Sequence, residues 1–399
     1  MSLTELWKNS RDQFENKQVH QIIAFAGESK LRDGSITSSD FREFLSHVSS
    51  DLLCHYAENC LNNSFNDSGL ALQDIINQVG KRLGFNVEDG RYRGNKNSIG
   101  NDGLWLFPSG HYVVVEVKTT DTYRIDSNIL AEYRKKLVTS QKISEEKSSI
   151  LIVVGREDTG DLEAQIRGSR HAWDVRLISV DSLLRLMRLK EKVDDPQIIQ
   201  RICDILIPKE FTRLDNIVDI VFFTAEEAEQ DAVTENLDDL PNVNINKKQI
   251  ERIDKPMAFN EACVEKFSSR NKVDLIRQTK TKYSSADKNY KVVCLVSKDY
   301  EKLKAASEKN NSSFWYGFHN HQKEFLEDAE KGYLILGCGS SNNILVVQLN
   351  EVIDWLDELN TTIKDPDLYW HLRIFLENGK YLLDKKQGKG RLNISKYKM

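Results

Sequence analysis

The sequence predicts an α/β fold built on a mixed β-sheet, and three observations lead to this prediction. Helix-like and strand-like segments alternate over residues 69–190 in the order α-β-β-β-α-β-α-β-α, which is typical of helices packed on the faces of a sheet. Residues 149–155 are almost continuously apolar, as in a strand buried on both faces. Of the 399 residues, 40% are hydrophobic and 29% are charged, enough apolar material for two or three domains.

The side-chain pattern predicts each element of this α/β unit in turn. Apolar residues at helical spacing, with a glycine at the end, predict a helix at about 70–84. Three strand-like runs separated by turn residues follow. These runs lie at 85–92, 103–108 and 111–118. The later elements are a helix at 127–138, the strand at 149–155, a helix at 161–170, a strand at 175–179 and a helix at 180–190.

An N-terminal helical segment, residues 1–68, precedes the α/β unit. Its apolar residues Phe41, Phe44, Leu45, Val48, Leu52 and Leu53 recur at helical spacing. Ser39 or Asp40 is the expected N-cap of that helix. No pattern of catalytic or metal-binding residues occurs in this segment, so we expect it to serve packing or dimerisation.

The rest of the chain is predicted to hold an appendix, a linker and a second domain. Residues 191–225 read as a helical appendix, so the α/β domain spans residues 69–225. Residues 226–257 are rich in acidic and polar residues, which is typical of a linker. Residues 258–399 contain several strands and helices, and we expect a strand-rich α+β domain that could take a small barrel-like form.

Composition excludes some classes of protein. The net charge is −5, so nucleic-acid binding would have to come from local basic patches. No apolar run is long enough to span a bilayer, and the polar start is not a signal peptide. The six cysteines form no C-x-x-C pair. A reduced, cytoplasmic location without membrane contact is the expectation.

Three residues form the candidate catalytic site. Asp102 lies between two glycines, where a turn leads into the strand at 103–108. Alternation along 111–118 places Glu116 and Lys118 on one face of the next strand. If these strands pair as a hairpin, Asp102 approaches both. Two neighbouring carboxylates repel unless a cation lies between them, and Mg²⁺ prefers such oxygen ligands. A metal-activated attack on a phosphodiester is predicted, with Lys118 deprotonating or positioning the water and stabilising developing charge.

The pattern D-x(13)-E-x-K, formed by these residues, resembles the PD-(D/E)xK nuclease superfamily. The resemblance covers residues 70–190 and implies a restriction-endonuclease-like core of order α-β-β-β-α-β. It implies that Asp102 and Glu116 are metal ligands and Lys118 the catalytic lysine, with the backbone carbonyl of Val117 completing the metal site. Asn101 stands where the motif has a proline, a departure that is frequent in the family.

The resemblance also implies cofactors, partners and a biological role. Mg²⁺, or Mn²⁺ in its place, would be the cofactor, and the chain would be a restriction or phage-defence endodeoxyribonuclease. Cutting both strands of a duplex suggests a homodimer, and other proteins of a defence operon are candidate partners. Many family members carry an acid on the helix before the sheet, where this chain has Gln73 or, one residue on, Asp74. Two alternatives stay open: a nuclease effector whose C-terminal domain senses a small ligand, and a non-catalytic DNA-binding protein on a decayed nuclease fold.

Basic and aromatic residues elsewhere are candidates for DNA contact, and we expect residues 258–399 to be the domain that recognises the DNA target. One group precedes Asp102 in a basic loop, a second lies on the helix after the fourth strand, and a third belongs to a stretch of the second domain where basic and aromatic residues alternate. The loop group is Arg91, Arg93 and Lys96. The helix group is Arg167 and Gln165, and Gln165 could also support the site. The group in the second domain is Lys280, Lys282 and Trp315. The sequence His319-Asn320-His321 spells an HNH triplet but lacks the surrounding ligands of an HNH nuclease, so we discount it.

Overall fold

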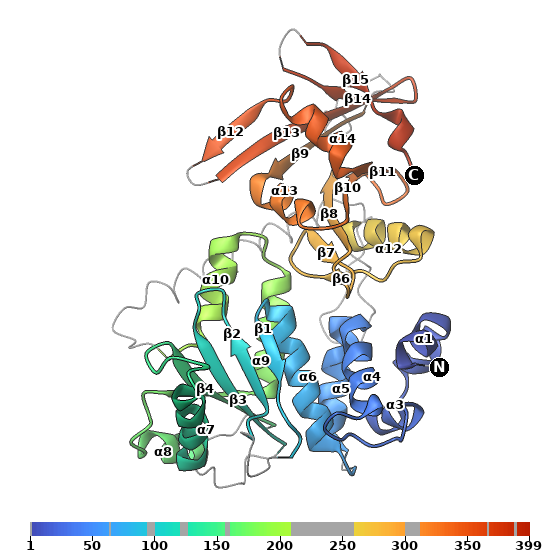
Figure 1. The fold of residues 1–399 in the computed structure, drawn as a ribbon. Helices are drawn as coiled ribbons and strands as arrows, with labels where there is room; N and C mark the ends of the chain where they lie inside the picture. The colour runs from blue at the N-terminus through green and yellow to red at the C-terminus, as the bar shows by residue number, and fades with distance from the viewer. Residues whose placement is uncertain are drawn as a thin grey trace, which may run out of the picture. The chain divides into compact units, whose positions relative to one another are not determined.

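The computed structural model of the protein describes residues 2–63, 65–93, 100–119, 127–155, 160–208, 259–299, 312–364, 367–386 and 389–399. The chain divides into two compact units, one within residues 1–216 and the other within residues 217–399 (Figure 1). The predicted linker at 226–257, and the part of the predicted appendix beyond residue 208, lie outside the described residues.

A mixed five-stranded sheet forms the centre of the first unit, as predicted. Its strands, in spatial order, are β1 (Asn86–Asp89), β2 (Gly103–Leu106), β3 (Tyr112–Lys118), β4 (Ser148–Val154) and β5 (Val175–Ser179). Strands β1, β2 and β3 pair antiparallel, whereas β3, β4 and β5 pair parallel. Each strand lies within or next to the residues assigned to it from the sequence.

Helices cover both faces of this sheet. The helices are α6 (Ser68–Leu83), α7 (Ser127–Thr139), α8 (Gly160–Arg167), α9 (Val180–Glu191) and α10 (Pro196–Asp204). Val113 and Val115 of β3 share a buried cluster with residues of α6 and α9, while Val114 joins residues of α7 and α8 on the other face. The alternation predicted for β3 is therefore confirmed. Helix α6 ends at Leu83 and is capped by Gly84, which adopts a left-handed φ of 99° that suits glycine.

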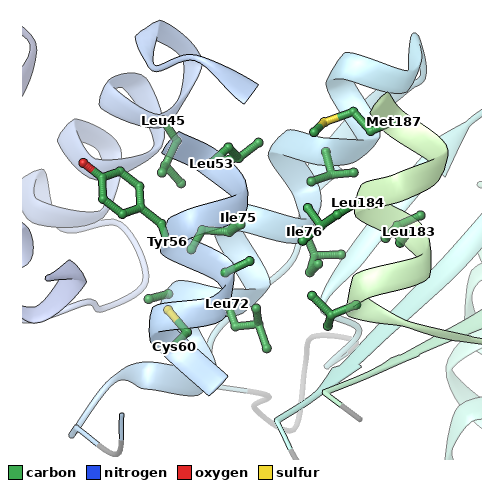
Figure 2. Close-up of a cluster of buried hydrophobic side chains, with 14 of the residues drawn as sticks. Leu45, Leu53, Tyr56, Cys60, Leu72, Ile75, Ile76, Leu183, Leu184 and Met187 are labelled. Atoms are coloured by element: carbon green, nitrogen blue, oxygen red, sulfur yellow. The ribbon is translucent and has the colours of Figure 1, made fainter. Parts of the chain in front are cut away.

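The N-terminal segment packs into the core of the same unit. Its helices are α1 (Leu3–Asn9), α2 (Arg11–Glu15), α3 (Val19–Phe25), α4 (Ile36–His47) and α5 (Ser50–Asn62). Figure 2 shows side chains of α4, α5, α6 and α9 gathered in one cluster, with Leu45, Tyr56, Ile76 and Leu184 among them. The apolar residues that predicted a helix in this segment are all 8% exposed or less: Phe41, Phe44, Leu45, Val48, Leu52 and Leu53. These side chains are buried in the core of the first unit and so cannot form a dimer interface. A homodimer remains a prediction and would need another surface.

The predicted N-cap of the N-terminal helix is wrong. Helix α4 begins at Ile36, because the hydroxyl of Ser35 accepts the N–H of Ser38 (3.2 Å). Asp40 instead accepts the N–H of Leu3 through both carboxylate oxygens at 2.9 Å. Its side chain thus joins α1 to α4 rather than starting a helix.

The second unit contains two open sheets. The first runs β11-β10-β8-β7-β6 and includes β6 (Ile276–Arg277), β7 (Lys282–Ser284), β8 (Tyr290–Ser297), β10 (Lys331–Cys338) and β11 (Ile344–Gln348). The second consists of β9 (Ser312–His319), β12 (Thr361–Lys364), β13 (Asp367–Glu377), β14 (Lys380–Asp384) and β15 (Arg391–Asn393). Strand β13 pairs with β12, β14 and β9. Neither sheet closes on itself among the described strands, so the barrel we considered is wrong there.

Helices α12 (Phe259–Asn271), α13 (Asn320–Glu327) and α14 (Leu349–Leu356) complete the second unit, with a short 3-10 turn, η1, at Ser395–Tyr397. Helix α12 packs on one face of the first sheet. The other face shares a core with α13, α14 and the inward side chains of the second sheet, such as Tyr316 and Leu372. None of the described helices has the length and apolarity needed to cross a membrane.

Candidate active site

The hairpin of β2 and β3 brings the three predicted site residues together. The N–H of Asp102 donates to the carbonyl of Val115 (3.0 Å), which extends the pairing of the two strands by one residue. The carboxylate of Asp102 turns back toward β3, and its Oδ2 accepts the N–H of Val117 at 2.7 Å. Asp102 therefore lies beside the strand segment that carries Glu116 and Lys118, as predicted.

Glu116 and Lys118 occupy the same face of β3, and the ammonium Nζ donates to Glu116 Oε1 at 2.5 Å. Glu116 is only 8% exposed. Its second oxygen, Oε2, is buried and has no hydrogen-bond partner within the described part of the chain. Leaving a buried charged oxygen unpaired costs at least about 1–3 kcal/mol, so the site is suited to an additional cation or donor.

The electrostatics of the three residues are interdependent. Burial, and then the negative charge of Glu116, raise the pKa of Asp102 to about 7, against the opposing effects of the Val117 N–H and the Lys118 ammonium. For Lys118, burial lowers the pKa, but Glu116 and Asp102 together outweigh burial and leave the pKa raised. The site thus contains a lysine that stays protonated and one carboxyl group that titrates near neutral pH.

Tyr133 on α7 is also close enough to feel these charges. Burial, followed by the negative charge of Glu116, raises the pKa of its phenol, and Lys118 acts in the opposite direction. The hydroxyl therefore stays protonated at neutral pH and can donate a hydrogen bond. Nothing in the sequence pattern had linked this residue to the site.

Helix α6 holds the main chain of Asp102 in place. The side-chain amides of Gln73 and Asn77 both donate to the Asp102 carbonyl, at 3.0 and 2.8 Å, and the N–H of Gly90 does so at 3.0 Å. Gln73 and Asn77 are four residues apart and so lie on one helix face. Gln73, proposed from the sequence as a supporting residue, therefore contacts the Asp102 main chain in this structure.

Close packing sets the distance between α6 and β2. Asn77 Oδ1 accepts the indole N–H of Trp105 at 3.0 Å. A Cβ added at Gly80 would lie 2.6 Å from the Trp105 ring, and one added at Gly103 would lie 2.2 Å from Asn77 Oδ1. Both glycines are required by this close approach of helix and strand, which in turn positions Asp102.

The donor set fits a hard divalent cation. Asp102 and Glu116 supply carboxylate oxygens. The N–H of Val117 faces Asp102. In a strand, the N–H and the carbonyl of one residue point to the same side, so the Val117 carbonyl also points toward Asp102. No group of three His, Cys, Asp or Glu side chains that could hold a metal occurs among the described residues. A site with two carboxylates suits Mg²⁺, which usually keeps several waters or phosphate oxygens as ligands.

The other predicted residues of the first unit have mixed outcomes. Asp74 is buried and committed to an ion pair with Arg42 (2.8 Å). It also accepts the hydroxyl of Tyr92, so Asp74 is not available as a metal ligand. Gln165 and Arg167 are exposed on α8, where Arg167 pairs with Glu163 (3.0 Å), and no described contact joins them to the site.

The basic loop before Asp102 begins at the site itself, because Gly90 is bonded to the Asp102 carbonyl. Arg91 and Arg93 follow it and are exposed. The loop backbone is anchored by Asp33, which accepts the N–H groups of Tyr92 and Arg93 at 2.9 and 3.2 Å. Lys96 lies outside the described residues.

The candidates in the second unit differ in exposure. Trp315 is 39% exposed and lies on β9. Lys280 is half-buried. Lys282 is only 8% exposed and its ammonium lies over the ring of Phe325, 5.7 Å from the centroid. The expectation that Lys282 is displayed for phosphate contact is therefore wrong, because its side chain packs against α13.

No family model matches the chain, and the search of characterised proteins finds no relative. What the protein does is therefore inferred from the residues described above.

Proposed function

We propose that the chain is a Mg²⁺-dependent endodeoxyribonuclease that hydrolyses phosphodiester bonds at Asp102, Glu116 and Lys118, with its second unit contacting the target. One observation carries the proposal. An apolar strand, β3, ends in a buried carboxylate with an unpartnered oxygen, a lysine paired to its other oxygen, and a second carboxylate beside it. Such a group is costly to bury unless it serves to bind a cation.

The bound Mg²⁺ would supply a Lewis acid for the phosphate and lower the pKa of a water molecule. The chain's own residues do the rest. Glu116 and Asp102 would hold the cation, and the bonds from α6 to the Asp102 main chain keep the carboxylate in place. Lys118, whose ammonium is paired with Glu116 Oε1, would position the phosphate or the attacking water and stabilise developing negative charge.

Charge near the site supports a nucleic-acid substrate. Arg91 follows directly on Gly90, which is bonded to the Asp102 carbonyl, and Arg93 lies two residues further on; both side chains are exposed. Arginine pairs well with phosphate, and phosphate contacts supply most of the affinity for DNA. A duplex or single strand held there by its backbone would bring a phosphodiester to the carboxylates.

Cleavage of plasmid and oligonucleotide DNA, measured with Mg²⁺ and with EDTA, tests the proposal. Wild-type protein should cut only with the metal, and Glu116→Gln should lose at least about 99% of the rate, because the metal loses a charged ligand. Glu88→Gln is the matched control, since Glu88 is an exposed acid on β1 that pairs with Lys142. Equal rates for Glu116→Gln and wild type would overturn the assignment.

A further inference from the structure

The outer face of the second sheet in unit two carries a row of aromatic side chains. In the pairing of β9 with β13, Tyr369 lies opposite His319 and His371 lies opposite Gly317. The odd-numbered residues of both strands share this face, since the even-numbered ones, such as Tyr316 and Leu372, point into the core. The row consists of Trp315, His319, Tyr369 and His371.

The rings contact one another in sequence. His319 and Tyr369 stack with centroids 5.0 Å apart, Tyr369 and His371 are 5.1 Å apart, and His371 and Trp315 are 5.7 Å apart. Gly317 lies among them, and a Cβ there would be 3.4–3.5 Å from atoms of Tyr369, His319 and Trp315. A larger side chain at 317 would separate these rings.

Hydrogen bonds hold the most exposed ring in place. The indole N–H of Trp315 donates to His371 Nδ1 at 3.2 Å, and His371 Nε2 lies 2.7 Å from the hydroxyl of Thr362 on β12. Because Nδ1 accepts, the proton of the neutral ring is on Nε2, which donates to Thr362. Trp315 is thus oriented in advance yet 39% exposed, so a ligand would not have to order it.

A guanidinium borders the row. Arg373 is exposed and is the cross-strand partner of Trp315. The guanidinium carbon of Arg373 lies 4.9 Å from the ring centroid of Phe375, and the guanidinium carbon of Arg391 lies 4.0 Å from the same centroid. Arg391 is neutralised by Glu377 at 2.7 Å, whereas no ion pair of Arg373 with another described residue is seen. Arg373 is therefore a cation on this face that an anionic ligand can reach.

We propose that this face binds unpaired bases of single-stranded DNA, with bases stacking on the ring row and a backbone phosphate at Arg373. Aromatic rings on an open sheet, bordered by cations, are the combination that single strands require. From Tyr369 to Phe375 the face spans about 20 Å at roughly 3.3 Å per residue. That length suits several successive nucleotides, whereas a free nucleotide needs an enclosing pocket.

The inference rests on the proposed function only in taking the polymer to be DNA. Binding is therefore measured without cleavage, on the full chain carrying Lys118→Ala, by fluorescence polarisation of a labelled single-stranded oligonucleotide. Adding Trp315→Ala should weaken binding at least about tenfold, and Trp315→Phe should retain most of it, because a stacking surface remains. Arg373→Gln should weaken binding and reduce its salt dependence by about one phosphate contact.

Two comparisons make the test specific. Trp173→Ala removes an indole that is 77% exposed in the first unit and should leave the affinity unchanged. A duplex of the same sequence should be insensitive to Trp315→Ala, since its bases are stacked already.

Equal affinity of the parent and Trp315→Ala proteins for the single strand would overturn the inference. So would binding of a free deoxynucleoside monophosphate with no binding of the oligonucleotide, since the face would then be a small-ligand sensor. Failure of the nuclease proposal would show in the cleavage assay alone and would leave these affinities as they are.

Discussion

Replacing Asp102 by asparagine removes a half-buried negative charge while keeping an oxygen that can accept the Val117 N–H. In the metal-free protein the raised pKa of Asp102 means that folding favours its protonated form. The folded state then binds more protons than the unfolded state between pH 4 and 7. Stability from this residue is complete below its unfolded pKa and is lost as pH rises through about 7. Asp102→Asn has no such titration.

The magnitude follows from the same shift. The rise in pKa from 3.8 to about 7, at about 1.4 kcal/mol for each tenfold change in proton affinity, amounts to about 4 kcal/mol at pH 8. This value is an upper bound for the stabilisation by Asp102→Asn. At pH 5 the difference should fall to about 2 kcal/mol, because the folded-state carboxyl is still protonated there and the loss of stability keeps growing until the pH reaches about 7.

Urea unfolding at pH 8 and pH 5 in EDTA measures this difference. Thermal unfolding is then measured with Mg²⁺ at about a hundred times its Kd. The Tm of the wild-type protein should rise by about 5–10 °C, and the Tm of Asp102→Asn should stay nearly unchanged. Asp181→Asn, at an exposed ion pair with Arg185, is the control and should change stability by less than about 0.5 kcal/mol. A mutant less stable than wild type at pH 8, or one equally stabilised by Mg²⁺, would refute the reasoning.

Three further substitutions test how the site is held. Gly80→Ala should destabilise the protein by about 1–3 kcal/mol, because its Cβ would lie 2.6 Å from the Trp105 ring. Asn77→Ala removes the bonds to the Asp102 carbonyl and the Trp105 indole, so cleavage should slow roughly ten- to a hundredfold. Arg42→Ala leaves buried Asp74 without its ion-pair partner and should cost about 3–5 kcal/mol at pH 8. Burial already raises the pKa of Asp74 to about 6, so this loss should be smaller at pH 5. Denaturant midpoints and cleavage rates measure these effects.

For each of these variants, one result would contradict the prediction. A Gly80→Ala protein as stable as wild type would mean that α6 does not press against Trp105. Cleavage by Asn77→Ala at the wild-type rate would remove α6 from the support of the site. Arg185→Ala, at an ion pair where Arg185 is 75% exposed, should change stability by less than about 0.5 kcal/mol. Arg42→Ala should lower the free energy of unfolding clearly more than this control does, and an equal loss in the two variants would contradict the prediction.

The site residues on β3 could be predicted because a strand has a period of two. That period places Glu116 and Lys118 on one face without further information, and the glycines beside Asp102 mark the turn before β2. Asn77 could have been found as well, since it lies four residues after Gln73 on the apolar face of a helix, where a buried amide needs a partner. Tyr133 could not, because its approach to the carboxylates depends on how α7 packs against the sheet.

The second unit was harder to predict for physical reasons. Strands β7, β12 and β15 are short and polar, so they have little hydrophobic pattern of their own and exist through pairing with longer neighbours. The second sheet depends on the pairing of β9 with β13, two strands that are far apart in the chain. Lys282 was misjudged because a basic stretch does not reveal that its ammonium packs over Phe325.

The most direct test of the central claim separates metal binding from catalysis at one residue. Lys118→Ala removes the ammonium but leaves both carboxylates, so Mg²⁺ affinity measured by calorimetry should be retained or should rise, because a competing cation is gone from Glu116. The rate of DNA cleavage by the same protein should fall at least about a hundredfold, because the charge that stabilises the transition state is gone. Cleavage by Lys118→Ala at the wild-type rate, with Mg²⁺ bound, would contradict the assignment of Asp102, Glu116 and Lys118 as a nuclease site.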